Sequence, residues 1–411
     1  MASADLERVA AAEGVSAADL AASAARGESI IIPSRRGAAP VGVGPALRAK
    51  FACIIGTSST RPDLEELRHK ALAAVESGAS VVHNGSAGAN FRETTKMLLD
   101  LVQIPLAAPQ PTGLMAHAQS EGRRLGDLQE KEFVAQIRSD IEAGFEVLPI
   151  PLGASRTLLR TMRESRRLMP CCSKCGSLVT AWMLQNDAEN PYLSHLDEIL
   201  HMVAESRTVL SIVAGYRPGA IHDALDALQL AELRTIEQVV GRAHAAGAQV
   251  KVITGGHLPI HKIGPFFAQQ QAALKTPLLA FGPQVTDTSV GLDHISSAMG
   301  QIQALVSGAD MIFSMTRAEH IGMPSVDETR EGCHVASMVC HSANLARGFD
   351  QHRDDELSAA RERMDWVKQA EFAAADAVKA RLLASATSSQ CDVCGDFCAI
   401  KTMRRYGAKG S

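Results

Sequence analysis

The sequence lacks any apolar run of about 18 residues and lacks a recognisable secretory signal peptide. It also lacks a charge excess, because a formal net charge of -4 is spread over 411 residues without long blocks of like charge. Nucleic acid and membrane surfaces are therefore not expected partners. Nine unevenly spaced cysteines do not form the even set of a disulfide framework. These absences favour a cytoplasmic protein with reduced thiols that acts on a small molecule.

What the chain does contain is 46% hydrophobic residues, enough to bury a large core. Eight short apolar runs have the length and composition of buried strands. They lie at 51–55, 81–83, 105–108, 147–150, 209–213, 250–253, 278–281 and 311–314. Because segments of helical period separate most of them, we predict an α/β fold with a closed (βα)8 barrel of the TIM type. The alternative is an open, doubly wound sheet.

Helices are predicted between these strands at 63–77, 92–102, 131–143, 195–206, 221–246, 263–275 and 294–307. Glycines stand where a helix C-cap belongs, at Gly78, Gly144, Gly247 and Gly308. Residues 1–28 have a weak helical period, and 30–32 form a short strand. We divide the chain into an N-terminal extension at 1–50, a catalytic barrel at 51–348 and a helical C-terminal domain at 349–411.

Polar and titratable residues follow several of the predicted strands, where a barrel carries its active site. His257 and His294 come from neighbouring strand ends and have the chemistry to share one divalent metal ion. The alternative is that each is an ordinary structural histidine. Arg217, just before a Pro-Gly turn, is suited to a carboxylate or phosphate, and its alternative is a surface ion pair.

Near the C-terminus, Cys391, Cys394 and Cys398 place three thiols within eight residues. Thiolates favour iron–sulfur clusters and zinc over hard cations. Three ligands would leave one iron of a 4Fe–4S cluster open to a cofactor, whereas the alternatives are a zinc knuckle or a reactive tail. Ala-rich helices around 357–384 would carry this tail, with 387–389 either a hinge or an ordinary connector.

Several short motifs follow one another along the second half of the chain. They are RPGAIHDA at 217–224, QLAEL at 229–233, GHLPIH at 256–261, FGP at 281–283, DHISS at 293–297 and EHIGMP at 319–324. Their order resembles the phosphomethylpyrimidine synthase family of thiamin biosynthesis, a non-standard radical S-adenosylmethionine (SAM) family. The resemblance covers roughly residue 30 to the end of the chain.

The resemblance implies a dimeric barrel lyase whose tail cysteines, Cys391, Cys394 and Cys398, bind a 4Fe–4S cluster with SAM on the open iron. His257 and His294 would hold a second divalent metal, zinc or iron. A flavodoxin or ferredoxin would supply the electron. The family converts aminoimidazole ribotide to hydroxymethylpyrimidine phosphate, and a sister branch makes 5-hydroxybenzimidazole from the same substrate. A paralogue with another imidazole or nucleotide substrate and a non-catalytic, ligand-binding barrel are the alternatives.

The expected substrate contacts are His83, Ser173, Lys174, Cys175 and Arg217. This chain departs from the family at positions that usually face the substrate, and most of the replacements are apolar. They are Ile54 for Asn, His83 for Met, Pro151 for His, Ala214 for Asp, Ile253 for Glu and Leu279 for Tyr. The tail spacing is two then three residues instead of two then four, and the added thiols Cys171, Cys172 and Cys175 lie in the substrate loop. They have three interpretations, namely packing, a second metal site or direct chemistry.

Overall fold

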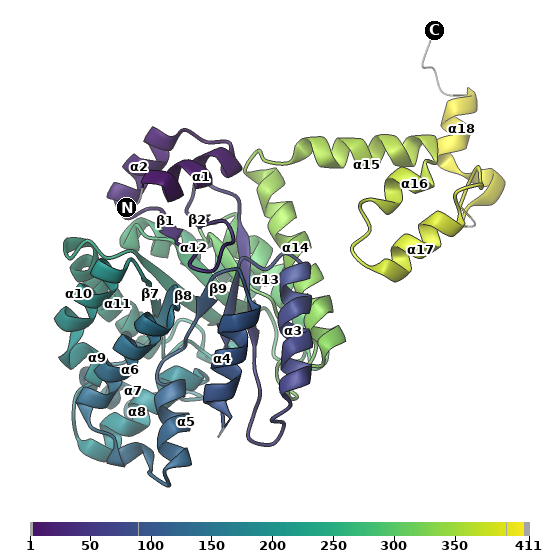
Figure 1. The fold of residues 1–411 in the computed structure, drawn as a ribbon. Coiled ribbons are helices and arrows are strands. Elements are labelled where there is room, and N and C mark those ends of the chain that lie inside the picture. The colour runs from purple at the N-terminus through teal and green to yellow at the C-terminus, as the bar shows by residue number, and fades with distance from the viewer. Residues whose placement is uncertain (1–2, 89, 392, 407–411) are drawn as a thin grey trace. The chain divides into compact units, whose positions relative to one another are not determined.

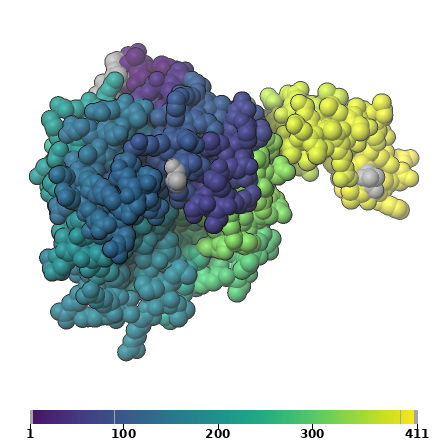
Figure 2. All heavy atoms as spheres, turned by 60° about the horizontal axis from the view of Figure 1, so that its bottom comes forward, coloured from purple at the N-terminus to yellow at the C-terminus, as the bar shows by residue number. Residues whose placement is uncertain are grey.

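The computed structural model describes residues 3–88, 90–391 and 393–406. The chain divides into two compact units, Met1–Ala343 and Asn344–Ser411. The larger unit is an α/β barrel (Figure 1). Figure 2 shows one face of this unit, and the segments that cover most of that face are coloured blue and teal. Among the described residues, no helix is long and apolar enough to cross a membrane.

Eight parallel strands form the barrel, and the last pairs with the first to close it. All eight predicted strands are confirmed, and closure excludes the open, doubly wound alternative. The strands are β3 (Lys50–Ile55), β4 (Val81–Asn84), β5 (Leu106–Ala107), β6 (Val147–Ile150), β7 (Val209–Val213), β8 (Val250–His257), β9 (Leu278–Gln284) and β10 (Met311–Phe313). Strand β8 runs four residues and β9 three residues past their predicted ends, so they carry their last side chains further toward the barrel rim.

The predicted helices between strands are present, and the four C-cap glycines all have positive φ. These helices are α3 (Leu64–Glu76), α4 (Phe91–Leu101), α6 (Glu130–Ala143), α10 (Leu196–Ser206), α11 (Ala227–Ala245), α12 (Ile260–Leu274) and α13 (Asp293–Leu305). The predicted start of α11 at residue 221 is wrong. Ile221–Asp223 is a separate 3-10 turn, Leu225 has φ +61°, and Asp226 caps α11 by accepting from the backbone N–H of Gln229.

Five helices of the described barrel region were not predicted: α5 (Thr112–Ser120), α7 (Arg156–Glu164), α8 (Lys174–Asn186), α9 (Pro191–Ser194) and α14 (Val326–Ala346). Three of them, α7 to α9, fill the long connection between β6 and β7. The N-terminal extension holds α1 (Ser3–Glu13) and α2 (Ala17–Ala25) and the antiparallel hairpin of β1 (Ile30–Ile32) and β2 (Val41–Val43).

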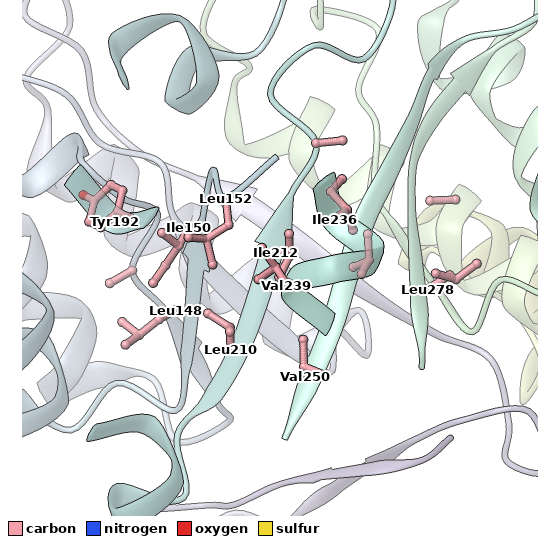
Figure 3. Close-up of a cluster of buried hydrophobic side chains, with 14 of the residues drawn as sticks. Leu148, Ile150, Leu152, Tyr192, Leu210, Ile212, Ile236, Val239, Val250 and Leu278 are labelled. Atoms are coloured by element: carbon pink, nitrogen blue, oxygen red, sulfur yellow. The ribbon is translucent and has the colours of Figure 1, made fainter. Parts of the chain in front are cut away.

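Side chains of the barrel strands alternate between two apolar layers. On the outer layer, Leu148, Ile150, Leu210 and Ile212 pack with Ile236 of α11 (Figure 3). Because successive strand residues point to opposite faces, their neighbours point inward. The inner layer joins residues of the strands to the β1–β2 hairpin: Ile30, Ile32, Val43, Ala52, Val81, Ala107, Val147, Val209, Val213, Ile253, Leu279, Met311 and Phe313. The hairpin thus packs against the amino-terminal side of the barrel interior.

One charged side chain interrupts this inner layer. Lys251 of β8 is 1% exposed, and its Nζ donates a hydrogen bond to Oγ of Ser211 on β7 at 2.9 Å. The two residues are register partners in adjacent strands. Desolvation lowers the pKa of Lys251 from 10.5 to about 7, because the ammonium loses its water and gains only a neutral hydroxyl.

The smaller unit is helical. It contains α15 (Gln351–Arg363), α16 (Trp366–Ala370), α17 (Asp376–Ala384), the 3-10 turn Gly395–Phe397 and α18 (Ala399–Tyr406). The indole N–H of Trp366 donates to the carbonyl oxygen of Ser388 at 2.7 Å, so the segment 387–389 is tied to α16 at its centre. Residues 407–411 of the predicted C-terminal domain lie outside the described residues.

We expect Lys251→Met to stabilise the protein most at pH 7 and below. The folded pKa lies below the unfolded value, so the wild type bears the full penalty of a buried ammonium below about pH 7 and loses it as the pH rises toward about 10.5. The gain at pH 7 should be on the order of a few kcal/mol. Urea unfolding at pH 7 and pH 10 measures it, with exposed Lys131→Met as the control. A gain that does not shrink at pH 10 would contradict this assignment.

Candidate functional site

A cavity of about 120 Å³ lies at the carboxyl ends of the barrel strands. Strand register sets its walls, because Ile54 pairs with His83 and Val213 pairs with Ile253, so these side chains stand at the same level. The cavity is lined by Ile54, His83, Gly85, Pro109, Pro149, Ser173, Lys174, Cys175, Val213, Arg217, Ile253, Phe281 and Phe313. The structure therefore brings all five expected substrate contacts around one cavity.

The turn after β7 positions Arg217. The carboxylate of Glu232, on α11, accepts hydrogen bonds from the backbone N–H groups of Gly215 at 2.5 Å and Tyr216 at 2.9 Å. Complete burial raises the pKa of Glu232 to about 7, although these two N–H groups and nearby arginines oppose that shift. Glu232 thereby fixes the backbone that leads into Arg217.

Arg217 itself is 7% exposed. One of its Nη atoms donates to the carbonyl oxygen of Ala214 at 3.1 Å, and the guanidinium carbon lies 4.2 Å from the centre of the Phe281 ring. A cation over an aromatic face is attracted by the ring quadrupole. The guanidinium is thus held against a cavity wall by one carbonyl and one ring.

The loop before α8 supplies another part of the cavity wall. Ser173 caps α8, its hydroxyl accepting from the backbone N–H of Gly176, and Nζ of Lys174 donates to the carbonyl oxygen of Gly85 at 2.9 Å. The two preceding thiols donate to backbone carbonyl oxygens of the turn after β7. Cys171 donates to the carbonyl oxygen of Gly215 at 3.1 Å, and Cys172 donates to that of Arg217 at 3.3 Å. They hold the loop against that turn.

Burial raises the pKa of the Cys171 thiol to about 11, and burial also raises the pKa of Cys175. Both groups therefore remain protonated at neutral pH, which disfavours thiolate chemistry in the protein as described. Within 3–88, 90–391 and 393–406, no group of three or more His, Cys, Asp or Glu residues is arranged to hold a metal ion. The contacts support the packing interpretation of the loop cysteines.

His83 and Ser173 are the two most enclosed polar residues of the cavity. His83 is 2% exposed, and its ring stands edge-on to Phe313 with centroids 4.8 Å apart at 83°. Desolvation, followed by repulsion from the charge of Lys251, holds the pKa of His83 well below 6.5. The imidazole is therefore neutral, with one nitrogen able to donate and the other to accept.

A set of histidines occupies the neighbouring part of the rim, after β8, β9 and β10. Nδ1 of His257 is hydrogen-bonded to Asp287 at 2.7 Å, and Nδ1 of His320 to Asp293 at 2.9 Å. The His257 and His320 rings lie 5.3 Å apart. Carboxylates that bind one imidazole nitrogen orient the other toward a metal. The sequence places His320 after the eighth strand, in the EHIGMP motif, but does not identify it as a candidate metal ligand.

His294, the other expected metal ligand, lies in the first turn of α13 in a different setting. It is buried, its Nε2 lies 3.9 Å from Glu331, and its Nδ1 has no hydrogen-bond partner among the described residues. A buried imidazole nitrogen without a partner is unfavourable unless a ligand or water completes it. Imidazole is a ligand type that divalent metals accept, but within the described residues no three donors of this rim are arranged around one point, so the metal site remains a prediction.

The tail cysteines lie in the smaller unit. Cys391 is half-buried, Cys394 is exposed and Cys398 is buried, and all three are free thiols. Asp392 lies outside the described residues. The 3-10 turn Gly395–Phe397 separates the second thiol from the third, with Gly395 at φ +53°. Three free thiols on one short loop are a suitable donor set for an iron–sulfur cluster.

A closed parallel barrel with a small-molecule cavity at its carboxyl rim defines an α/β-barrel enzyme. The chain belongs to the Radical SAM ThiC family, whose model matches residues 1–405. This family implies SAM and a 4Fe–4S cluster as cofactors. The family match confirms the resemblance inferred from the order of the motifs, and the closed barrel confirms the predicted fold.

Three relatives match almost the whole chain. Phosphomethylpyrimidine synthase of Moorella thermoacetica is 32% identical over 99% of this chain and 96% of its own length. Phosphomethylpyrimidine synthase of Pyrococcus abyssi is 32% identical over 97% and 94%, respectively. The 5-hydroxybenzimidazole synthase BzaA of Moorella thermoacetica is 31% identical over 98% and 95%. Identity is thus nearly the same to relatives of both names.

We expect Glu232→Gln to destabilise the protein by about 1–3 kcal/mol at neutral pH. An amide presents only one oxygen to the two backbone N–H groups, so one of them loses its acceptor in a buried site. Urea unfolding measures the loss, and Glu237→Gln, exposed on the same helix, is the matched control. Equal stability of the two variants would show that Glu232 does not hold the turn.

Proposed function

We propose that this protein is a radical SAM carbon–carbon lyase of the phosphomethylpyrimidine synthase type. Its assigned reaction converts aminoimidazole ribotide to hydroxymethylpyrimidine phosphate in thiamin biosynthesis. The observation that carries the proposal is the family match over residues 1–405, which spans both the barrel cavity and the three tail thiols. The names of the relatives from Moorella and Pyrococcus support the same reaction.

The tail cysteines Cys391, Cys394 and Cys398 are the proposed cluster ligands. When bound, the cluster supplies one electron that cleaves SAM to methionine and a 5'-deoxyadenosyl radical. The protein's part is to bind, orient and exclude water. The exposed Cys394 and half-buried Cys391 are accessible to incoming iron, and the buried Cys398 fixes the loop to the start of α18.

The substrate site is the cavity at the barrel rim. His83, Ser173, Lys174, Cys175 and Arg217 are the proposed substrate contacts, and all line it. Apolar walls exclude water from the reacting atoms, which protects a radical from side reactions. Lys174 is the exposed cation of the set, so it is placed to meet a phosphate as a point charge.

A second divalent metal, zinc or iron, is proposed at His257 and His294. Asp287 fixes the tautomer of His257 and leaves Nε2 for the metal, and the unpartnered Nδ1 of His294 supports the same role for that residue. His320 has a carboxylate partner of the same kind in Asp293, so we add it as a candidate ligand.

A second candidate function is a paralogue with a changed substrate, such as a 5-hydroxybenzimidazole synthase-like enzyme or one acting on another imidazole or nucleotide. The apolar walls favour it, because Ile54 and Ile253 line the cavity and cannot accept hydrogen bonds from a ribose or an amine. The similarity to BzaA of Moorella thermoacetica also supports it.

Residues 1–50 form an extension, 51–348 the catalytic barrel and 349–411 the domain that carries the cluster. The enzyme acts as a cytoplasmic homodimer that receives its electron from a flavodoxin or ferredoxin. Size-exclusion chromatography with light scattering tests the dimer.

The first test is an anaerobic assay of the full chain, reconstituted with iron and sulfide and supplied with reductant, SAM and aminoimidazole ribotide. Cys394→Ala should lower 5'-deoxyadenosine formation by more than about tenfold, because the cluster loses one of three thiolate ligands. Val393→Ala, at the exposed neighbouring position, is the control and should retain activity. Mass spectrometry measures 5'-deoxyadenosine and hydroxymethylpyrimidine phosphate.

A Cys394→Ala variant with a normal cluster and full SAM cleavage would overturn the assignment of the tail. Formation of 5'-deoxyadenosine together with hydroxymethylpyrimidine phosphate supports the thiamin reaction. Formation of 5'-deoxyadenosine without conversion of the ribotide favours the paralogue. Absence of SAM cleavage despite a full cluster would contradict the radical SAM activity itself.

Asp287→Asn should weaken the second metal by about 10- to 100-fold, because the amide no longer orients His257 as a carboxylate does. His257→Ala should weaken it further by removing a ligand. Metal content per chain after equilibration with a weak chelator measures both effects, and exposed His201→Ala is the control. Unchanged metal content in His257→Ala would exclude this histidine as a ligand.

A further inference from the structure

The loop that joins α7 to α8, residues 165–173, is held at its backbone by one buried carboxylate. Asp223, in the 3-10 turn that follows β7, is 2% exposed. Its Oδ1 accepts a hydrogen bond from the backbone N–H of Leu168 at 2.9 Å, and its Oδ2 accepts one from that of Met169 at 3.0 Å. Two consecutive N–H groups of the loop thus share one side chain, which lies 55 residues after Leu168 in the sequence.

Asp223 is ionised at neutral pH, so both of its oxygens can accept. Burial raises its pKa, but hydrogen bonds from His222 and from the two backbone N–H groups, with the nearby charge of Arg167, outweigh that effect and hold the pKa below its usual range. Nδ1 of His222 lies 2.9 Å from Oδ1 of Asp223, and the His222 side chain is 60% exposed. Water can therefore replace the imidazole, and a variant of His222 leaves the two backbone contacts in place.

A second carboxylate of the same turn holds the loop through a side chain. Nε and Nη2 of Arg167 donate to the two carboxylate oxygens of Asp226 at 2.8 and 2.7 Å. The Arg167 side chain is 1% exposed, so this forked pair is screened by water much less than a surface ion pair. Three consecutive residues of the loop, 167–169, are thus bonded to 223–226.

These bonds connect two walls of the cavity. Arg217 precedes the turn, Ser173 and Lys174 follow the bonded part of the loop, and all three line the cavity. The contacts from Cys171 and Cys172 to the same turn have thiol donors, which are weak. Charge-assisted hydrogen bonds are roughly twice as strong as neutral ones. The two carboxylates therefore provide most of what holds these walls together.

We propose that Asp223 is a positioning residue for the substrate, which holds the loop 165–173 against the turn after β7 so that Lys174 and Arg217 keep a fixed separation before the substrate binds. The pair of Arg167 and Asp226 assists it. The inference rests on the proposed function only in taking this cavity as the substrate site. Asp223 does not line the cavity, so it acts through the loop and not by contact with the substrate.

Alkylation of Cys171 measures whether the loop is held. Its thiol is half-buried, and burial raises its pKa to about 11, so iodoacetamide should react slowly with it while the loop stays in place. Trypsin releases both loop thiols in one peptide, residues 168–174, in which the exposed Cys172 is the internal reference. The protein is the full chain reconstituted with iron and sulfide, and mass spectrometry measures the rate at each site.

Asp223→Asn should raise the rate of Cys171 alkylation by about tenfold or more, because an amide has one oxygen for two N–H groups and a bond to a charged acceptor is lost. Asp226→Asn weakens the forked pair and should raise the rate as well. His222→Ala is the matched control and should leave the rate unchanged. Cys333, which is fully buried, should stay unreacted in every variant and shows that each is folded.

Kinetics with aminoimidazole ribotide test the effect on the substrate. Asp223→Asn should raise the KM for the ribotide by about three- to tenfold and leave the KM for SAM unchanged. The reason is that the loop lines the cavity assigned to the ribotide, whereas SAM is assigned to the cluster. A loss of folded enzyme alone would lower kcat without changing either KM.

Two results would overturn the proposal. One is equal alkylation of Cys171 in the wild type and in Asp223→Asn, a result that requires no activity. The other is faster alkylation with an unchanged KM for the ribotide. A wild type that forms no 5'-deoxyadenosine from SAM would contradict the proposed function separately, and the alkylation rates would then decide whether Asp223 holds the loop.

Discussion

Closure of the eight-stranded barrel is the constraint on which the rest of the structure depends. Once β10 pairs with β3, every second strand residue must point to the axis, where the β1–β2 hairpin covers the amino-terminal side. A polar group placed there has little access to water. Closure thus explains both the neutral state favoured for Lys251 and His83 and the apolar cavity that lies at the carboxyl rim.

The sequence predicts the barrel strands well because buried parallel strands are continuous apolar runs between glycine-capped helices. It predicts α14 poorly, for a physical reason. The buried stripe of α14 consists of Cys333, Ala336, Val339, Cys340 and Ala343, which have helical spacing but are mostly small residues, so the stripe differs little in hydrophobicity from the rest of the helix. Helices α7 to α9 were missed because their lengths and spacing follow the packing of the long β6–β7 connection and not a repeated βα pattern.

The candidate site is predictable to a similar degree. Motif order identifies the residues, and the barrel brings His83, Lys174 and Arg217 together although they are far apart in the chain. Sequence does not reveal which partner each polar group takes. The thiols of Cys171 and Cys172 donate to backbone carbonyls, and His320 is hydrogen-bonded to the carboxylate of Asp293. Such pairings depend on tertiary contacts between loops, so only the folded chain specifies them.

The contact between Gly176 and Gly215 has a consequence for how this site can evolve. A Cβ at Gly176 would lie 2.5 Å from the Cα of Gly215, so backbone meets backbone where α8 begins against the β7 turn. A side chain at Gly176 would push α8 away from the turn that carries Arg217, so the spacing of these two cavity walls depends on this close backbone contact. An exposed wall residue such as Lys174 takes no part in the contact. The site can therefore change its exposed side chains more readily than the distance between its walls.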